Sequence, residues 1–267
     1  LQPFWRNITM GSRWFPARLM PNLLIIGGSD SSGGAGVSAD VGTINHLGGI
    51  CYPCITAVTA QGDYGFFKSY PIPKSILEAQ LQSVKGQQID GIKIGMLPNR
   101  EAVEIVAAFI NEIPCSTVIL DPVLKTSSGK FLNTKDGILA LKENLFPISS
   151  LITPNLDEAN LLTSENCLHH EGVPELAQKC ISFGSGAVLI KGGHLNTNQC
   201  KDLLLVDGAI QKSFVHERIP NGTEVRGTGC RLASAIAYYI ACGNSLEFSI
   251  ENAITYIRNY ISQQTAL

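Results

Sequence analysis

Short apolar runs alternate along this chain with stretches in which apolar residues recur at every third or fourth position. The second pattern is typical of helices that bury one face, whereas runs such as residues 118–120 and 188–190 are apolar on both faces of a strand. Strands covered on both sides are typical of parallel sheets. The candidate strands are residues 23–27, 55–60, 92–95, 117–121, 151–153 and 187–191. The pattern predicts an α/β fold with helices on both faces of a central, mostly parallel sheet.

The last third of the chain departs from the repeated strand-helix pattern. Residues 203–206 and 213–218 flank Asp207 and Gly208, a pair that favours a tight turn, and predict an antiparallel hairpin at the end of the sheet. Residues 229–242 and 246–264 then predict two closing helices.

Length and charge narrow the class of protein. The 267 residues are 45% apolar and carry a formal net charge of -2, so the chain can bury one large core. There is no basic run, which argues against nucleic acid or an anionic membrane as the main partner. We find no apolar stretch of bilayer length and no signal-peptide pattern. These features favour a cytoplasmic protein that acts on a small molecule.

The first residues differ in character from the remainder. Residues 1–19 hold both tryptophans and show no periodicity, so we interpret them as a leader from an expression vector or an extended reading frame. An arm that binds a partner is the alternative. Residues 20–267 are expected to form a single domain.

Eight dispersed cysteines in a chain of this size are expected to be reduced thiols. Cys51 and Cys54 form one C-x-x-C pair, which suits a redox pair or half of a zinc site. Neither a second pair nor a closely spaced histidine supports that alternative. His169 and His170 are expected to lie in a loop.

The segment Val-Arg-Gly-Thr-Gly-Cys at residues 225–230 stands directly before a small-residue helix. Unpaired N–H groups of Gly227, Gly229 and Cys230 at a helix start, together with the helix dipole, predict an anion site. The same dipole is expected to lower the pKa of the Cys230 thiol, so that it accepts a proton or hydrogen bond from a hydroxyl. The alternative is close helix packing with an inert cysteine.

Polar and glycine-rich residues follow the candidate strands, at 27–30, 61–63, 95–96, 121–122, 153–155 and 191–194. Carboxyl ends of parallel strands meet at one edge of a sheet, where ligands bind. Residues 27–40 are predicted to be a flexible glycine turn entering a helix. It has no P-loop lysine, and we expect it to approach a flat substrate. Asp40 would accept a hydrogen bond from the substrate, or would be an ordinary carboxylate on the helix surface.

Residues 153–158 predict a strand end followed by a helix start. Asn155 and Glu158 would form a capping box, and their oxygens also suit Mg²⁺ held beside a triphosphate. Lys191, at the end of an apolar strand, can reach a phosphate. Combined with the anion site, these residues predict phosphoryl transfer.

Seven motifs in order, GGSDSSGGAG, TAVTAQ, IKIGML, DPV, ITPNLDEA, LIKGGHL and RGTGC, resemble those of the hydroxymethylpyrimidine and phosphomethylpyrimidine kinases of thiamine biosynthesis. The resemblance implies a ribokinase-like three-layer α/β/α sandwich, usually a homodimer, that uses ATP and Mg²⁺. Its substrates would be 4-amino-5-hydroxymethyl-2-methylpyrimidine and the corresponding monophosphate. It also assigns the site: the pyrimidine would be held by Gly28, Ala35, Asp40, Gln61, Met96 and Val123, the nucleotide by Asn155, Glu158, Lys191, Gly193 and Thr228, and the metal by Glu158 and Asp121, while Gly227, Gly229, Cys230 and Lys191 would be catalytic.

The chain departs from the family pattern at Arg226, Arg231 and Ala233, where the family usually has His, Thr and Ser. The two arginines would strengthen phosphate binding, or Arg231 would fill the space of the nucleotide. Two further hypotheses stay open. One is a pyridoxal kinase of the same superfamily, although this chain has Lys125-Thr126-Ser127 where such relatives carry a cysteine. The other is a non-catalytic pyrimidine sensor.

Overall fold

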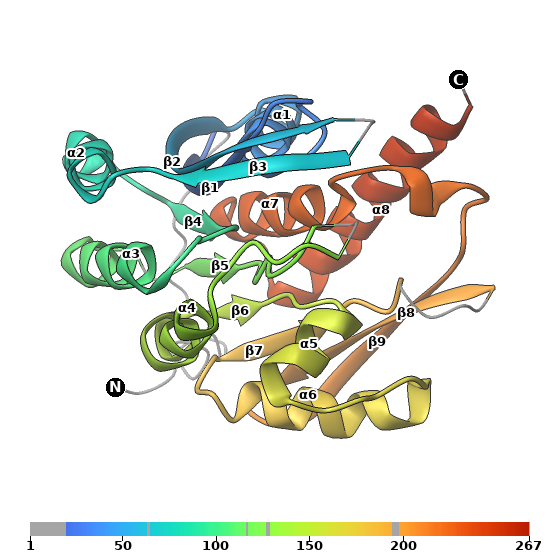
Figure 1. Cartoon of the computed structure of the whole chain (residues 1–267). Coiled ribbons are helices and arrows are strands. Elements are labelled where there is room, and N and C mark those ends of the chain that lie inside the picture. Colours follow the sequence, from blue (N-terminus) through green and yellow to red (C-terminus); the bar gives the residue numbers. More distant parts are fainter. Residues whose placement is uncertain (1–19, 63–64, 116, 127–128, 194–197, 267) are drawn as a thin grey trace.

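A nine-stranded sheet organises the computed structural model, which describes residues 20–62, 65–115, 117–126, 129–193 and 198–266 (Figure 1). The strand order is β3-β2-β1-β4-β5-β6-β7-β8-β9. The strands from β2 through β1 and β4 to β7 are parallel to their neighbours, and only β3, β8 and β9 pair in antiparallel fashion. The predicted mostly parallel sheet is therefore confirmed. The strands are β1 Asn22–Asp30, β2 Ile50–Gly62, β3 Gly65–Pro71, β4 Gly91–Ile94, β5 Val118–Leu120, β6 Leu151–Ile152, β7 Ala187–Ile190, β8 Gln199–Val206 and β9 Ala209–Glu217.

Helices cover both faces of the sheet and give the three layers seen in Figure 1. One face carries α1 (Gly36–Leu47), α7 (Thr228–Ala241) and α8 (Leu246–Thr265), whose apolar residues form one core cluster. The second cluster lies under the other helices: α2 Lys74–Val84, α3 Arg100–Glu112, α4 Lys135–Ala140 with its continuation Leu141–Ile148, α5 Leu156–Thr163 and α6 Val173–Ile181.

The antiparallel hairpin and the two closing helices lie where the sequence predicts them. Asp207 and Gly208 both have positive φ, 49° and 79°, as a two-residue hairpin turn requires. Helix α7 begins and ends one residue before its predicted bounds, whereas α8 begins at its predicted residue and ends one residue later than predicted.

Strand β3 was not predicted. It is an edge strand that pairs only with β2, and its Phe67 and Tyr70 are 69% and 62% exposed, so the strand has no buried face to produce an apolar signal. A register shift between Ala60 and Gln61 further disturbs the alternation along the β2–β3 hairpin.

The prediction of a flexible glycine turn from Gly27 was wrong in its first part. Gly27, Gly28, Ser29 and Asp30 continue β1 and pair with β2 after a register shift. The turn itself is residues 31–35, and α1 begins at Gly36. Pairing with a neighbouring strand outweighs the poor strand propensity of two glycines.

All eight cysteines are free, as expected. Cys51 and Cys54 are three residues apart on β2, so their side chains point to opposite faces of the sheet. Cys54 belongs to one core cluster and Cys51 packs against the other. This geometry excludes a redox pair or a shared metal.

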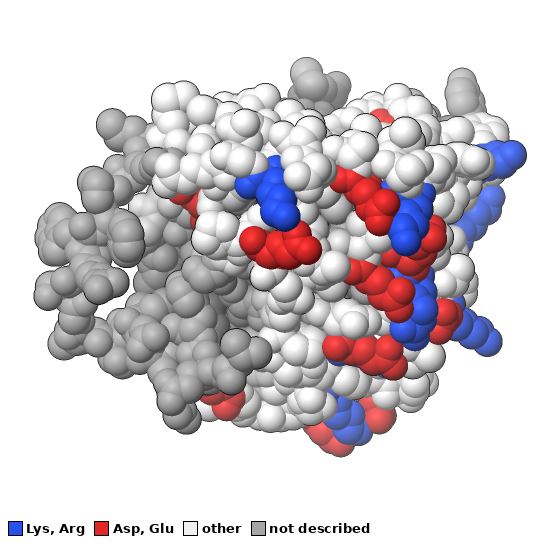
Figure 2. Space-filling model, turned by 90° about the vertical axis from the view of Figure 1, so that its left-hand side faces the viewer, with Lys and Arg blue, Asp and Glu red and all other residues white. Residues whose placement is uncertain are grey.

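Charges of both signs alternate on the face formed by α2, α3 and α4 (Figure 2). Ion pairs such as Lys85 with Glu112 and Arg100 with Glu104 account for this mixture. No helix in the described ranges is long and apolar enough to cross a membrane. The predicted leader at residues 1–19 lies outside the described residues.

Candidate active site

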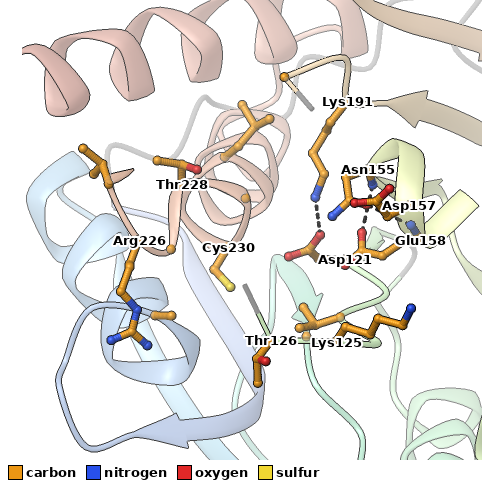
Figure 3. Close-up of a pocket in the computed structure, with 18 of the residues that line it drawn as sticks. Asp121, Lys125, Thr126, Asn155, Asp157, Glu158, Lys191, Arg226, Thr228 and Cys230 are labelled. Atoms are coloured by element: carbon orange, nitrogen blue, oxygen red, sulfur yellow. Dashed lines mark hydrogen bonds and ion pairs between the residues drawn. The ribbon is translucent and has the colours of Figure 1, made fainter. Parts of the chain in front are cut away.

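A large cavity of about 1610 Å³ opens at the carboxyl ends of the parallel strands. Every residue that the sequence assigns to the site lines this one cavity, although these residues come from seven separate segments of the chain. One end is lined by the turn after β1 and the end of β2, and the other by α5, β7 and α8. The start of α7 lies between the two ends, as the close-up in Figure 3 shows.

The start of α7 has the geometry of an anion site. Gly227 is its N-cap, with φ 70°, and no side chain caps the helix. A Cβ at Gly227 would collide with the carbonyl oxygen of Gly34, so only glycine allows the two loops to touch. Among the residues that the structure describes, no side-chain acceptor is found for the first N–H groups of the helix, from Thr228 to Cys230, and these residues line the cavity.

The thiol of Cys230 differs from its predicted state. Burial among protein atoms raises the pKa of Cys230 to about 11, although the Lys93 ammonium and the Gly36 N–H favour the thiolate. The nearby Asp40 and Asp121 oppose these two groups. The expectation that the helix dipole lowers this pKa was therefore wrong, because loss of hydration and two carboxylates outweigh the dipole.

The raised pKa of Cys230 predicts that its thiol is alkylated rapidly only at high pH. Only the thiolate reacts with iodoacetamide, so the rate at Cys230 should rise about tenfold per pH unit past pH 9, with its midpoint at about 11. Mass spectrometry of the labelled peptide measures the rate, with N-acetylcysteine as the reference thiol. A midpoint at or below pH 9 would contradict the structure.

Lys191 and Asp121 form a buried ion pair at the centre of the cavity. Lys191 Nζ lies 2.7 Å from Asp121 Oδ1, and Thr153 Oγ1 donates to the same oxygen at 3.2 Å (Figure 3). Burial alone would raise the pKa of Asp121, but Lys191 and Lys93 outweigh it and lower that pKa. The carboxylate is thus ionised and the lysine charged. Lys191 Nζ would lie 3.2 Å from a Cβ at Gly229, so its charge adjoins the anion site.

Asn155 and Glu158 form the predicted capping box at the start of α5. Asn155 Oδ1 accepts from the Glu158 N–H, and Glu158 Oε2 accepts from the Asn155 N–H, both at 2.8 Å. Burial raises the pKa of Glu158 to about 7, with Lys191 opposing the rise and Asp121 adding to it. The cap also orients the Glu158 carboxylate toward the cavity.

Asp121 and Glu158 are the residues that fit Mg²⁺ best. Each carboxylate uses one oxygen in the contacts above, so Oδ2 and Oε1 remain for a metal. Within the described ranges, no three His, Cys, Asp or Glu side chains gather into a protein-only metal site. Mg²⁺ held by one or two carboxylates and completed by nucleotide phosphates and water fits this donor set.

Gly28, Ala35, Gln61, Met96 and Val123, which the sequence assigns to the pyrimidine, all line the cavity. A Cβ at Gly28 would lie 2.7 Å from the Met96 sulfur, so a glycine at this position leaves room for the Met96 side chain to pack against the backbone of β1. The Met96 carbonyl is fixed in turn by the Thr56 hydroxyl, which donates to it at 2.6 Å. A flat ring can therefore meet backbone on one side and a thioether on the other.

Sequence reasoning missed Lys93. It is fully buried on β4, and its Nζ lies 2.7 Å from Asp40 Oδ2, while Ser234 Oγ on α7 donates to Asp40 Oδ1 at 2.9 Å. Burial alone would lower the pKa of Lys93, but Asp40 outweighs it and raises that pKa. Asp40 is thus neither exposed nor a free acceptor, and the alternative of a surface carboxylate was wrong. A lysine inside the apolar segment 92–97 was the available signal.

The two unusual arginines differ in position: Arg226 lines the cavity, whereas Arg231 does not. Arg231 is 9% exposed, donates to the Ala39 carbonyl at 3.0 Å and stacks on Tyr260 at 4.3 Å, so it packs between α1, α7 and α8. Arg226 turns away from the mouth of α7 toward the loop after β1 (Figure 3). Arg231 is absent from the cavity lining, so the expectation that it fills the space of the nucleotide was wrong, whereas stronger phosphate binding through Arg226 stays a prediction.

The fold and this site define a small-molecule kinase of ribokinase-like architecture. The phosphomethylpyrimidine kinase family model matches residues 30–267. A hydroxymethylpyrimidine/phosphomethylpyrimidine kinase of Haemophilus influenzae is 36% identical over 244 residues, which are 90% of each chain. The chain therefore belongs to the phosphomethylpyrimidine kinase family.

Other relatives extend this comparison. A thiamine biosynthesis bifunctional protein of Geobacter sulfurreducens is 38% identical over 237 residues, 88% of this chain, which spans only about half (48%) of that longer protein. A phosphomethylpyrimidine kinase from Clostridium difficile superposes with a TM-score of 0.78 at 30% identity, covering 91% of this chain and 99% of the other. The pyridoxal kinase from Staphylococcus aureus in complex with pyridoxal has a TM-score of 0.81 at 26% identity, covering 91% and 88%.

Proposed function

We propose that this kinase transfers the γ-phosphoryl group of ATP to the hydroxymethyl oxygen of 4-amino-5-hydroxymethyl-2-methylpyrimidine, and that of a second ATP to the phosphate of the resulting monophosphate, which gives the diphosphate. The observation that supports the proposal is that the residues assigned to the pyrimidine, those assigned to the nucleotide and Cys230 all line one cavity. The family membership and the relatives named for both phosphorylations support it.

The nucleotide end offers separate places for phosphates and base. Lys191 and the first N–H groups of α7 would bind the phosphates, beside Thr228 and Gly193. The base would lie among aliphatic side chains contributed by α8 and the segment before α7, namely Ile219, Val225, Ile254, Ile257 and Ile261. Mg²⁺ held by Asp121 and Glu158 would neutralise phosphate charge.

Transfer requires an in-line attack at the start of α7. The substrate oxygen bonds to the γ-phosphorus while the bond from that phosphorus to the bridging oxygen of ADP breaks. Helix N–H groups and Lys191 stabilise the charge on the transferring group. Because its pKa is about 11, Cys230 must first lose its own proton to solvent, and the resulting small thiolate fraction then takes the hydroxyl proton. That proton leaves late because the transition state is loose.

ADP release with Mg-ATP tests the proposal when hydroxymethylpyrimidine, its monophosphate and pyridoxal are compared side by side. Turnover on both pyrimidines with little on pyridoxal is the expected result. A preference for pyridoxal, which the similarity to the pyridoxal kinase fold motivates, would replace the proposed substrate. Lys125 and Thr126 line the cavity where pyridoxal-preferring relatives carry a cysteine, and Ser127 lies outside the described residues.

The sensor hypothesis receives less support, because Arg226 pairs with Asp30 and Arg231 donates to the Ala39 carbonyl. Calorimetry that detects pyrimidine binding without ATP binding would restore it. A homodimer in the cytoplasm remains part of the proposal, and size-exclusion chromatography with light scattering tests the oligomeric state.

Lys191→Met should raise the KM for ATP roughly tenfold, the loss of about 1.5 kcal/mol from one charged hydrogen bond. Steady-state kinetics at fixed pyrimidine measures the change. Lys191→Arg keeps the charge and should recover part of the affinity. Lys212→Met, at an exposed ion pair on β9, is the matched control. An unchanged KM in Lys191→Met would remove this lysine from phosphate binding.

A further inference from the structure

The Arg226 side chain joins its own loop to Ser32 and Asp30, which lie 194 and 196 residues away in the chain. Its Nη1 donates to Ser32 Oγ at 3.0 Å and its Nη2 donates to Asp30 Oδ2 at 3.3 Å. Arg226 directly precedes the N-cap Gly227 of α7, whereas Asp30 ends β1. The arginine therefore links the anion site to the acceptor loop, which we define as residues 30–36.

The carboxylate of Asp30 organises the acceptor loop. Its side chain is 1% exposed, and it accepts hydrogen bonds from the Ser32 N–H at 2.9 Å, the Ser32 hydroxyl at 2.8 Å and the Ala35 N–H at 2.9 Å. The guanidinium of Arg226, whose side chain is 28% exposed, completes this set. A charge-assisted contact that is mostly shielded from water is stronger than an exposed pair.

The acceptor loop is also tied to the pyrimidine end of the cavity. Ser31 Oγ donates to the Gln61 carbonyl at 2.7 Å and accepts from the Gln61 N–H at 3.0 Å. On its other side, the Gly34 carbonyl touches Gly227, and the Gly36 N–H points to the Cys230 sulfur. One continuous set of contacts thus runs from Gln61 to the start of α7.

The orientation of the Arg226 side chain distinguishes a residue that binds phosphate from one that positions the loops. A phosphate ligand would point its guanidinium into the space in front of Thr228 and Cys230. Figure 3 shows the guanidinium turned to the opposite side of this loop. The positive charge of Arg226 is paired with Asp30. Arg226 therefore affects the reaction indirectly, by fixing the positions of the two loops that it joins.

We propose that Arg226 is a positioning residue that clamps the anion site to the acceptor loop through Asp30 and so sets the distance from the acceptor hydroxyl to the transferring phosphoryl group. This proposal rests on the proposed function. Small misplacements of reacting atoms are costly even when binding is kept, because rate depends on the near-attack geometry. The clamp should therefore affect kcat more than the KM for ATP.

Steady-state kinetics of Arg226→Gln, Asp30→Asn and the double variant test the clamp. Each single change should lower kcat roughly tenfold, with the KM for ATP changed less than threefold, and the double variant should match the singles. Arg226→Lys keeps one charged donor and should recover part of kcat. Three results would each overturn the proposal. One is a change that falls mainly on the KM for ATP, the second is a kcat of the double variant lowered by the product of the two single effects, and the third is an unchanged kcat.

Hydrogen exchange of the free protein gives a readout that needs no turnover. Amides of residues 31–36 should exchange faster in Arg226→Gln and in Asp30→Asn, and no faster again in the double variant. Arg100→Gln, which breaks an exposed ion-pair cluster on α3, should leave this segment unchanged. Unchanged exchange in both clamp variants would overturn the clamp, whereas absent pyrimidine turnover in the wild-type protein would overturn only the proposed function.

Discussion

Replacing Cys230 by alanine is expected to lower kcat for pyrimidine-dependent ADP release by about 100-fold or more, the typical contribution of a proton acceptor placed at the reacting atoms. Cys230 lines the cavity together with the residues proposed to hold the pyrimidine and those proposed to hold the nucleotide. It is also the group toward which the starts of α1 and α7 converge. The KM for ATP should change little, since the helix N–H groups and Lys191 remain.

Two further variants separate proton transfer from packing. Cys230→Ser keeps the size and hydrogen bonding, but a hydroxyl is a far weaker acid than a thiol, so its kcat should stay at least about tenfold below wild type. Cys242→Ala, at the other end of α7, is the control and should keep full activity. A kcat for Cys230→Ala within about threefold of wild type would remove the sulfur from the reaction.

Lys93→Met should destabilise the protein by about 3–5 kcal/mol, the cost of leaving one member of a buried ion pair without its partner. Lys93 and Asp40 are both fully buried and lie between β4, α1 and α7. With the ammonium gone, the buried Asp40 carboxylate would lose its countercharge and, of the contacts described above, keep only the Ser234 hydroxyl. Urea denaturation followed by circular dichroism measures the change.

A double variant shows whether the unpaired charge is the cause. Lys93→Met with Asp40→Asn removes both charges, so it should recover much of the lost stability. Lys74→Met breaks an exposed pair with Glu78 and should change stability by less than about 0.5 kcal/mol. If the double variant is as unstable as the two single losses added together, the destabilisation has another cause, such as lost packing.

The predictions from sequence were most accurate where one local pattern decides the structure. Continuous apolar runs located the buried strands, and the Asp207-Gly208 turn located the hairpin, because each signal acts over a few residues. The capping box of Asn155 and Glu158 was readable for the same reason. The edge strand β3 could not be predicted, because it has no buried face and its sequence shows no alternation of apolar and polar residues.

The site residues were found as separate strand ends, and their meeting in one cavity follows from the parallel order of the sheet. The electrostatics of the site could not be predicted in this way. The pKa of Cys230 and the pairing of Asp40 with Lys93 depend on burial and on charges from distant segments.

The sequence by itself determined the α/β class, the order of the strand-end motifs and the glycines that allow loops to touch, because these depend on local propensity and spacing. Only the tertiary structure decided which charges pair. It turned Arg226 to Asp30 and Arg231 to Tyr260, and it enclosed Lys93 under the cavity. The physical reason is that the energy of a charge depends on its distance from other charges and on its exposure to water, and both arise only when segments far apart in the chain pack together.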